Sequence, residues 1–261
     1  MFKKSLLLGA LALAASFSVA AKDWKEIRVA IDPTYKPFTF KTADGKPTGL
    51  DVKMAEALCD KVMAKCIFVE QQWDAMIPGL MAKKYDAIIS SMSITEERLR
   101  QVAFTGKYYN TPSKVVVRKD IKTDGTAASL KGKRIGVLKG STQEAYALGE
   151  LKPAGVVVNS YEAQDQVYLD LKAGRIDGTV ADYLEVSGGF LSKPEGAAFA
   201  LMGPELRDPK YYGYGIGVAM RLGQGDPGAE PLQRLAAGGA EGSERRVQRM
   251  RRRQRLPGRI Q

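Results

Sequence analysis

Residues 86–98, DAIISSMSITEER, combine hydroxyl groups with a guanidinium, the side chains that could bind a small anion. The apolar residues 87–89 predict a buried strand, and polar side chains follow at its carboxyl end: Ser90, Ser91 and Ser93. Open α/β sheets bind their ligands at the carboxyl ends of strands. An arginine such as Arg98 can bind a carboxylate through two parallel hydrogen bonds. The run therefore predicts a site for a small carboxylate.

A short helix is expected to hold Arg98 at this position. Thr95 is a suitable N-cap, and Glu96 and Glu97 favour the first turn because carboxylates stabilise the positive end of a helix. The alternative is that the helix is simply solvated and that Arg98 pairs with Glu97 or with water.

Strand and helix patterns alternate along the rest of the chain, which predicts an α/β fold. Strands are predicted over residues 27–31, 66–70, 114–118, 156–158, 175–182 and 213–219, helices over residues 50–59, 73–81 and 163–171, and a strand-to-helix unit over residues 130–143. Residues 83–90 resemble residues 173–180, since each segment contains a helix end, a turn, an aspartate and a buried strand. This echo predicts two similar lobes that face each other across a cleft.

The amino-terminal segment predicts export. Residues 1–4 include two lysines, residues 6–19 are apolar, and residues 18–20 fit a cleavage site of small residues. We expect a signal peptide over residues 1–21 and a mature protein in the periplasm. The apolar segment is too short for a stable membrane span.

The net charge of +11 is unevenly distributed. The first four residues contribute +2, and residues 223–261, with nine arginines and four acidic residues, contribute +5, which leaves +4 for the rest. A nucleic-acid-binding protein needs a basic face with aromatic side chains. We therefore expect no nucleic-acid partner, and the alternative, a basic tail that acts as an arm for nucleic acid or acidic membranes, is less favoured.

The chain contains no histidine and only two cysteines, Cys59 and Cys66. Catalysis by Ser-His-Asp or Cys-His groups is thereby excluded, and two cysteines alone cannot complete a zinc site. We expect neither a metal nor a cofactor. In an oxidising compartment the two cysteines favour a disulfide over two buried free thiols.

Four features together carry a family resemblance: residues 32–38 (DPTYKPF), residues 86–95, residues 136–146 (GVLKGSTQEAY), and the pair Cys59 and Cys66. In this order they resemble the family 3 periplasmic solute-binding proteins that feed polar amino acids to ABC importers, most closely the lysine/arginine/ornithine-binding group. The resemblance runs from about residue 22 to residue 221. It implies a two-lobed α/β periplasmic-binding-protein fold, in which hinge strands join the lobes around a ligand cleft.

The resemblance implies a site for a cationic L-amino acid: arginine, lysine or ornithine, with histidine as a further candidate. Arg98 would bind the α-carboxylate with help from Thr142 at a helix start, and Asp182 would bind the α-ammonium. Asp32 would pair with the distal cation. The implied ligand-binding residues are Asp32, Tyr35, Trp73, Ser90, Ser91, Ser93, Arg98, Leu138, Ser141, Thr142, Gln143 and Asp182.

Simpler interpretations stay open for three of these residues. Tyr35 and Trp73 either sandwich the aliphatic stem of the ligand or are ordinary core aromatics. Asp32, which precedes Pro33, either binds the ligand or only caps the end of a strand. Family members often carry Phe where Trp73 stands, so its wider ring would favour arginine or a larger guanidino compound.

The chain is expected to divide into four mature segments. Residues 22–110 would form the first part of lobe 1, residues 113–206 lobe 2, and residues 215–227 the return to lobe 1. Residues 228–261 depart from the family, because they are rich in Gly and Arg and contain no Lys. Shifting permitted codons for residues 243–249 by one base yields ANGEYS, a turn like that of the family. We interpret this segment as an aberrant, frame-shifted tail that destabilises the first lobe.

These observations predict a monomeric binding protein without enzymatic activity, whose partner is an inner-membrane ABC permease. The alternative is an exported dehydratase-like enzyme on the same fold. Such an enzyme would need a catalytic acid in place of a residue that clamps the amino acid. The intact pair of Arg98 and Asp182 favours the binding protein.

Overall fold

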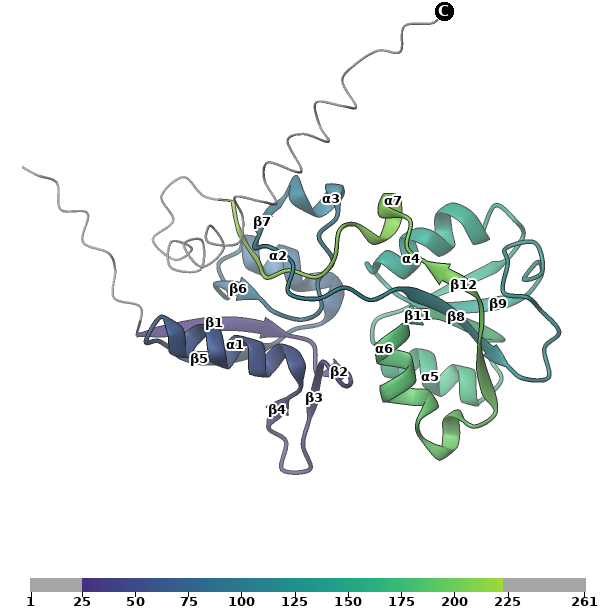
Figure 1. Ribbon diagram of the computed structural model, residues 1–261, viewed down its shortest axis with the longest axis horizontal. Helices are drawn as coiled ribbons and strands as arrows, with labels where there is room; N and C mark the ends of the chain where they lie inside the picture. The colour runs from purple at the N-terminus through teal and green to yellow at the C-terminus, as the bar shows by residue number, and fades with distance from the viewer. Residues whose placement is uncertain (1–24, 223–261) are drawn as a thin grey trace, which may run out of the picture.

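The computed structural model describes residues 25–222. Two five-stranded sheets form the centres of two lobes that lie side by side (Figure 1). The strand order is β5-β1-β6-β13-β7 in the first sheet and β10-β9-β11-β8-β12 in the second. The predicted two-lobed α/β fold is thereby confirmed.

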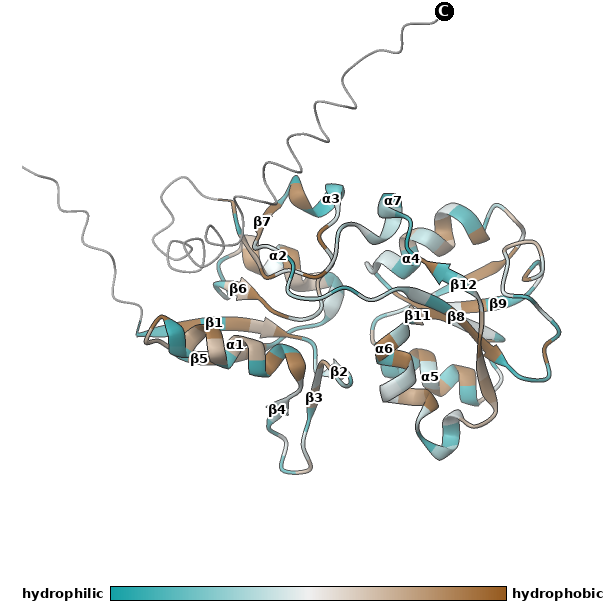
Figure 2. Ribbon diagram, viewed as in Figure 1, coloured by the Kyte–Doolittle hydropathy of each residue, from teal (hydrophilic) through white to brown (hydrophobic). Residues whose placement is uncertain are grey.

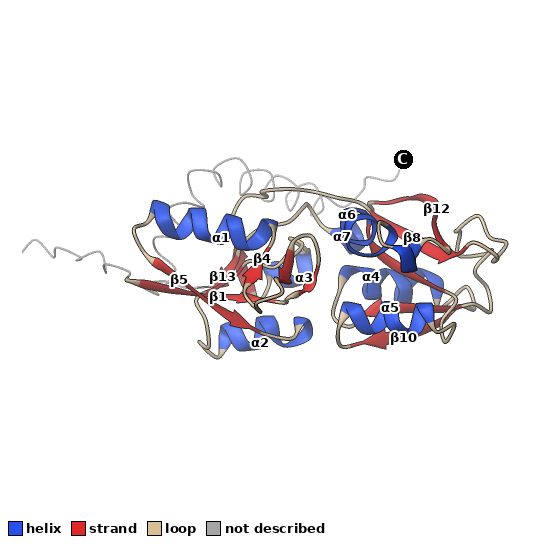
Figure 3. Ribbon diagram, turned by 90° about the horizontal axis from the view of Figure 1, so that it is seen from below, coloured by secondary structure: helices blue, strands red, loops and turns tan. Residues whose placement is uncertain are grey.

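The first sheet is mainly parallel and is covered on both faces. It contains β1 (Glu26–Ile31), β5 (Lys65–Glu70), β6 (Ala87–Ile88), β7 (Val102–Phe104) and β13 (Ala219–Arg221). Alternate residues of β1 face opposite sides. Val29 belongs to the core beneath α1 (Leu50–Lys61), whereas Ala30 belongs to the core beneath α2 (Met76–Met81). The two helices therefore cover opposite faces of the sheet, as Figure 3 shows.

The second sheet follows the same plan. It contains β8 (Ser113–Arg118), β9 (Arg134–Leu138), β10 (Val157–Tyr161), β11 (Gly178–Asp182) and β12 (Phe199–Leu206). One face carries α4 (Thr142–Tyr146) and its π-helical continuation η2 (Ala147–Leu151), and the other carries α5 (Gln164–Lys172). Figure 2 shows the apolar strands lying between these helices.

Each lobe contains the same arginine–aspartate clamp. Arg28 of β1 donates from Nε and Nη2 to the two carboxylate oxygens of Asp86, at 3.1 and 2.9 Å. Arg134 of β9 donates in the same way to Asp177, also at 3.1 and 2.9 Å. The backbone N–H of each arginine donates to the same aspartate. The echo between the two halves of the sequence thus reflects one structural unit that is used twice.

Short elements complete the two lobes. A small sheet joins β2 (Thr34–Tyr35), β3 (Thr39–Lys41) and β4 (Pro47–Thr48). The remaining helical turns are η1 (Trp73–Ala75), α3 (Glu96–Leu99), α6 (Tyr183–Val186), η3 (Ser187–Leu191), η4 (Pro194–Gly196) and α7 (Pro209–Tyr212). A disulfide between Cys59 and Cys66 joins the end of α1 to the start of β5, as expected.

The predicted strand over residues 213–219 is wrong. The strand β13 begins only at Ala219, and Ile216 makes isolated bridges instead of a ladder. Gly213 and Gly215 have φ angles of 68° and 113°, which a regular strand does not use. The pattern analysis also missed β2, β7 and β12, because these strands are short or contain Gly and Pro.

The chain passes from one sheet to the other through residues 105–112 and returns through residues 207–218. Within the described residues no helix is long and apolar enough to cross a membrane. The predicted signal peptide, residues 1–21, and the predicted aberrant tail, residues 228–261, lie outside the described residues.

Candidate functional site

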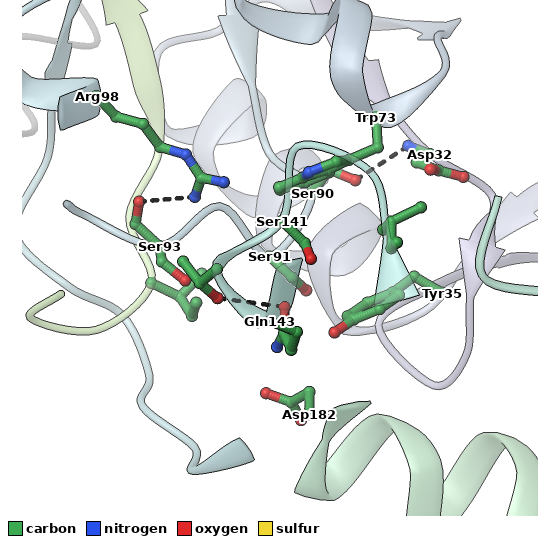
Figure 4. A pocket seen from close by; sticks show the side chains of 13 residues that line it. Asp32, Tyr35, Trp73, Ser90, Ser91, Ser93, Arg98, Ser141, Gln143 and Asp182 are labelled. Atoms are coloured by element: carbon green, nitrogen blue, oxygen red, sulfur yellow. Dashed lines mark hydrogen bonds between the residues drawn. The ribbon is translucent and has the colours of Figure 1, made fainter. Parts of the chain in front are cut away.

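A pocket lies between the two lobes (Figure 4). The free space within it measures about 440 Å³, a volume that includes space open to the solvent. Its lining residues are Asp32, Tyr35, Trp73, Ser90, Ser91, Ser93, Arg98, Leu138, Ser141, Thr142, Gln143, Asp182 and Ile216. All of the candidate ligand-binding residues identified in the sequence are in this set.

Strand ends explain why these residues meet. Asp32 directly follows β1 and Ser90 follows β6, in the first lobe. Leu138 ends β9 and Asp182 ends β11, in the second lobe. Because parallel strands end at the same edge of a sheet, each lobe presents one polar edge to the other.

Ile216 also lines the pocket, and sequence analysis did not identify it. It belongs to the segment that returns to the first lobe, where it forms isolated bridges with Ser93 and Tyr109. A single apolar residue between glycines carries no chemical signal that separates a pocket residue from a core residue. Only the position of the returning segment reveals its role.

Arg98 connects the two lobes. Its side chain is nearly buried, and Thr95 caps α3 as expected by accepting a hydrogen bond from the Arg98 N–H at 3.2 Å. The guanidinium donates to the carbonyl of Ser93 at 3.1 Å and to the carbonyl of Gly140, in the other lobe, at 3.0 Å. It also lies 5.3 Å from the centre of the Trp73 ring. The two hydrogen bonds use two of the five donors of a guanidinium.

The charge of Arg98 has no carboxylate partner within the described residues. Burial lowers the pKa of its guanidinium to about 10, and the nearby charge of Glu97 opposes this shift. Arg98 contacts two carbonyls instead of pairing with Glu97, so the solvated-helix alternative is wrong. The group stays protonated at neutral pH, and a buried cation without a counter-charge favours a bound anion.

Asp32 caps the end of β1 and also lines the pocket. Its Oδ1 accepts hydrogen bonds from the Thr34 N–H at 3.0 Å and from the Thr34 hydroxyl at 2.7 Å, so it caps the end of β1. Its own N–H donates to the hydroxyl of Ser90 at 3.0 Å (Figure 4). Burial raises the pKa of the Asp32 carboxyl, against the lowering effect of the hydrogen bonds from Thr34. A cation in the pocket would stabilise its ionised form.

Tyr35 and Trp73 both face the pocket and both pack against the first lobe. The ring of Tyr35 stacks on Phe38 with centroids 6.0 Å apart. Trp73 packs against the core beneath α2 while it also lines the pocket beside Arg98. Both residues therefore contribute to the packing of the first lobe, and both also line the pocket.

Asp182 is a buried carboxylate at the start of α6. Its Oδ1 accepts hydrogen bonds from the N–H groups of Leu184 and Glu185, at 2.9 and 3.1 Å, and from the hydroxyl of Thr111 at 3.3 Å. Burial raises the pKa of Asp182 to about 6, although these hydrogen bonds lower it. All three hydrogen bonds use one oxygen, and Asp182 lines the pocket, so its other oxygen is suited to accept from a ligand.

A second carboxyl group, Glu185, lies beneath Asp182 and was not identified in the sequence. It is almost completely buried and accepts a hydrogen bond from the hydroxyl of Tyr168 at 2.5 Å. Burial raises the pKa of Glu185 well above its usual value, and the charge of Asp182 raises it further. Within the described residues no group of three or more acidic or cysteine side chains is arranged to hold a metal ion.

The loop after β9 is held rigidly by its own hydrogen bonds. Ser141 caps α4 by accepting from the N–H of Glu144 at 3.0 Å. Gln143 accepts from the hydroxyl of Thr142 at 3.2 Å and donates to the hydroxyl of Ser113 at 2.9 Å. The polar groups of this loop are therefore positioned before any ligand arrives.

An interlobe seam, formed by Gln72, Asp74, Lys139 and Glu162, lies beside the pocket. The Nζ of Lys139 is 3.0 Å from Asp74 of the first lobe and 3.6 Å from Glu162 of its own lobe. Gln72 donates to Glu162 at 3.4 Å. Together with the hydrogen bond from Arg98 to Gly140, these contacts hold the lobes together, so the structure represents a closed arrangement.

Comparison with known proteins gives a consistent result. Residues 27–185 match the model of the bacterial extracellular solute-binding proteins, family 3. The L-arginine-binding protein of Pseudomonas aeruginosa is 44% identical over 247 residues, which cover 94% of this chain and 95% of that protein. The lysine/arginine/ornithine-binding periplasmic protein of Escherichia coli is 44% identical over 223 residues, which cover 84% and 85%.

Similar structures have also been solved. An arginine-specific periplasmic binding protein of Salmonella typhimurium has a TM-score of 0.73 and 31% sequence identity to this chain. The match covers 85% of this chain and 98% of that one. The similarity thus extends over both lobes and includes the elements that form the pocket.

Proposed function

The chain belongs to the bacterial extracellular solute-binding proteins of family 3, and we propose that it binds a cationic L-amino acid as the substrate-binding component of an ABC importer. Arginine, lysine and ornithine are the preferred candidates, and histidine is a further one. The observation that carries this proposal is the presence of Arg98 and Asp182 in the lining of one pocket. They are buried charges of opposite sign that line one pocket from different lobes.

A free amino acid matches this pair. Its α-carboxylate would accept hydrogen bonds from the guanidinium of Arg98, and its α-ammonium would donate to the carboxylate of Asp182. Thr142, the first residue of α4, would contribute its backbone N–H as a further donor to the carboxylate, because its hydroxyl proton is already donated to Gln143. Because the two charges belong to different lobes, a ligand that binds both stabilises the closed arrangement. Ligand binding and lobe closure would then be one event.

A third charged group favours a cationic side chain. Figure 4 shows Asp32 at a different corner of the pocket from both Arg98 and Asp182. A distal ammonium or guanidinium group beside Asp32 would stabilise its buried carboxylate. Tyr35 and Trp73 would contact the aliphatic stem and the cation, and a cation–π contact contributes about 0.5–2 kcal/mol.

The proposed location and partners follow from family membership. The named relatives are binding proteins, which favours this function over the dehydratase-like alternative. We propose that the protein acts in the periplasm and delivers its ligand to an inner-membrane permease. We further propose that it acts as a monomer, because one chain supplies the whole described lining of the pocket.

The proposal is tested by isothermal titration and thermal melts of the exported protein with L-arginine, L-lysine, L-ornithine, L-histidine and L-glutamine. A ligand at 1,000 times its Kd should stabilise the fold by about 4 kcal/mol. Asp32→Asn keeps an acceptor for Thr34 but removes the charge. We expect this variant to bind the cationic amino acids about 10- to 100-fold more weakly and L-glutamine with little change. Wild-type protein that melts cooperatively, yet responds to none of the five amino acids, would contradict the proposal.

A further inference from the structure

A buried carboxylate that does not line the pocket lies directly behind it. Asp51, in the first turn of α1, is fully buried. Its Oδ2 accepts a hydrogen bond from the hydroxyl of Ser91 at 2.7 Å, and its Oδ1 accepts one from the hydroxyl of Tyr108 at 2.7 Å. Burial raises the pKa of Asp51, while the hydrogen bonds from Ser91 and Tyr108 lower it. Asp51 is absent from the lining of the pocket, and its hydrogen-bonded neighbour Ser91 is part of that lining.

The hydrogen bonds of Ser91 fix the direction of its hydroxyl group. Its single proton is donated to Asp51, and the hydroxyl of Tyr109 donates to the Ser91 oxygen at 2.7 Å. A hydroxyl group has one proton and two lone pairs. One lone pair is thus left to face the pocket. Ser91 can accept a hydrogen bond from a ligand but has no proton to donate to it.

Aromatic packing holds this arrangement in place. Tyr109 stacks on Phe38 with centroids 4.9 Å apart and an interplanar angle of 11°. Tyr108 meets the edge of Tyr109 at 5.1 Å. Ser91 itself has a φ angle of 54°, a left-handed conformation that residues other than glycine rarely adopt. Such a conformation persists when surrounding contacts enforce it, and it is enriched at ligand sites.

The charge of Asp51 also affects Asp182, the carboxylate that lines the pocket from the second lobe. Burial is the main cause of the raised pKa of Asp182, and the charge of Asp51 adds to it. The charges of Asp51 and Asp182 also raise the pKa of Tyr109 beyond the effect of burial. Ser91 and Asp182 line the same pocket, and Figure 4 shows Ser91 close to Gln143 and Tyr35.

Resting on the proposed function, we propose that Asp51 is a positioning residue that orients the Ser91 hydroxyl so that it can only accept a hydrogen bond from the α-ammonium of the ligand. Asp182 supplies the charge that attracts the ammonium. Ser91, fixed by Asp51, supplies a hydrogen-bond acceptor. A ligand group that can only accept hydrogen bonds finds no donor at this point of the pocket. The pocket then selects an amino acid over an otherwise identical carboxylic acid.

Asp51→Asn tests this role because it is nearly isosteric and changes the direction of one hydrogen bond. The introduced amide can donate to the Ser91 oxygen, which would turn the Ser91 proton toward the pocket and against the ammonium. The ligands are L-arginine and 5-guanidinopentanoate, which is arginine without its α-ammonium. We expect Asp51→Asn to weaken arginine binding at least about tenfold and to leave binding of the analogue within about twofold of wild type. Equal losses for both ligands, or no loss for either, would overturn the proposal.

Two further variants keep the test decisive. Ser91→Ala removes the acceptor itself, so it should lower the arginine-to-analogue preference, and adding Asp51→Asn to it should lower that preference no further. If Asp51→Asn does not fold, an unchanged preference in Ser91→Ala alone overturns the proposal. Asp44→Asn, at an exposed turn, removes one negative charge far from this network and serves as the matched control. Wild-type protein that binds no cationic amino acid would instead refute the proposed function, before any variant is compared.

Discussion

The ammonium group of Lys139 lies 3.0 Å from the carboxylate of Asp74, and this ion pair joins the second lobe to the first at the rim of the pocket. Because the pair joins residues of different lobes, it adds to the stability of the arrangement in which the lobes are in contact. Because apparent affinity depends on the fraction of protein that can close around the ligand, residues that never touch the ligand can still change its Kd.

Lys139→Ala should therefore weaken binding of L-arginine by about two- to fivefold, the range expected for a partly exposed ion pair. High salt should lower the affinity of the wild type for L-arginine toward the affinity of the variant. Lys41→Ala is the matched control, because Lys41 pairs with Glu70 within the first lobe at similar exposure. Titration calorimetry at low and high salt measures both variants. Equal effects of the two substitutions would contradict a role for the seam in closure.

Arg98→Lys should abolish most of the affinity while it retains the positive charge. A lysine cannot make two parallel hydrogen bonds to a carboxylate or reach Ser93, Gly140 and the ligand together. We expect a loss of affinity on the order of 100-fold for every amino acid that binds. The melting temperature of the ligand-free variant separates this loss from unfolding. Retention of wild-type affinity would show that the carboxylate binds elsewhere.

Binding should weaken at acidic pH because Asp182 has a pKa of about 6. Its carboxyl becomes protonated as the pH falls through 6, and a neutral carboxyl attracts an ammonium group poorly. One proton with this pKa predicts an affinity about tenfold lower at pH 5 than at pH 7. Titrations across this range should show the slope in the wild type and a flatter profile in Asp182→Asn. A wild-type profile without slope between pH 5 and pH 7 would contradict the assignment.

The same raised pKa has a defined effect on the ligand-free fold. Between the ordinary value near 3.9 and the value near 6, the folded state holds more protons than the unfolded state. The contribution of Asp182 to the free energy of unfolding therefore decreases as the pH rises through this window. Asp182→Asn should remove that decrease, and chemical denaturation at several pH values measures it.

The disulfide between Cys59 and Cys66 should stabilise the protein without changing its ligand affinity. It closes a loop with a sequence separation of 7, for which chain entropy predicts about 2.5 kcal/mol. Replacing both cysteines by serine should lower the melting temperature by roughly 5–10 °C. The affinity for L-arginine should stay unchanged, because the bond lies at the amino end of β5 and the pocket lies at the carboxyl ends of the strands. Adding a reductant to the wild type provides the control and should produce the same shift.

Local sequence patterns were sufficient to predict the strand before Ser90 and the short helix that holds Arg98. The buried run before Ser90 and the N-cap at Thr95 act within a few residues of Arg98, and the structure confirms both. The family resemblance then ordered residues from distant segments into one candidate site. The prediction of a strand over residues 213–219 was wrong because the conformations of the glycines between residues 213 and 217 depend on contacts with distant segments of the chain.

The sequence by itself determined which strands end in polar groups and which residue types meet a ligand, because hydrophobic periodicity and capping act over a few neighbouring residues. Only the tertiary structure decided that Arg98 donates to Gly140, that Ile216 completes the pocket and that Asp51 stands behind Ser91. These relationships join residues far apart in the chain, at separations of 42 for Arg98 and Gly140 and 40 for Ser91 and Asp51. Their geometry is set by the packing of whole elements, which no local pattern encodes.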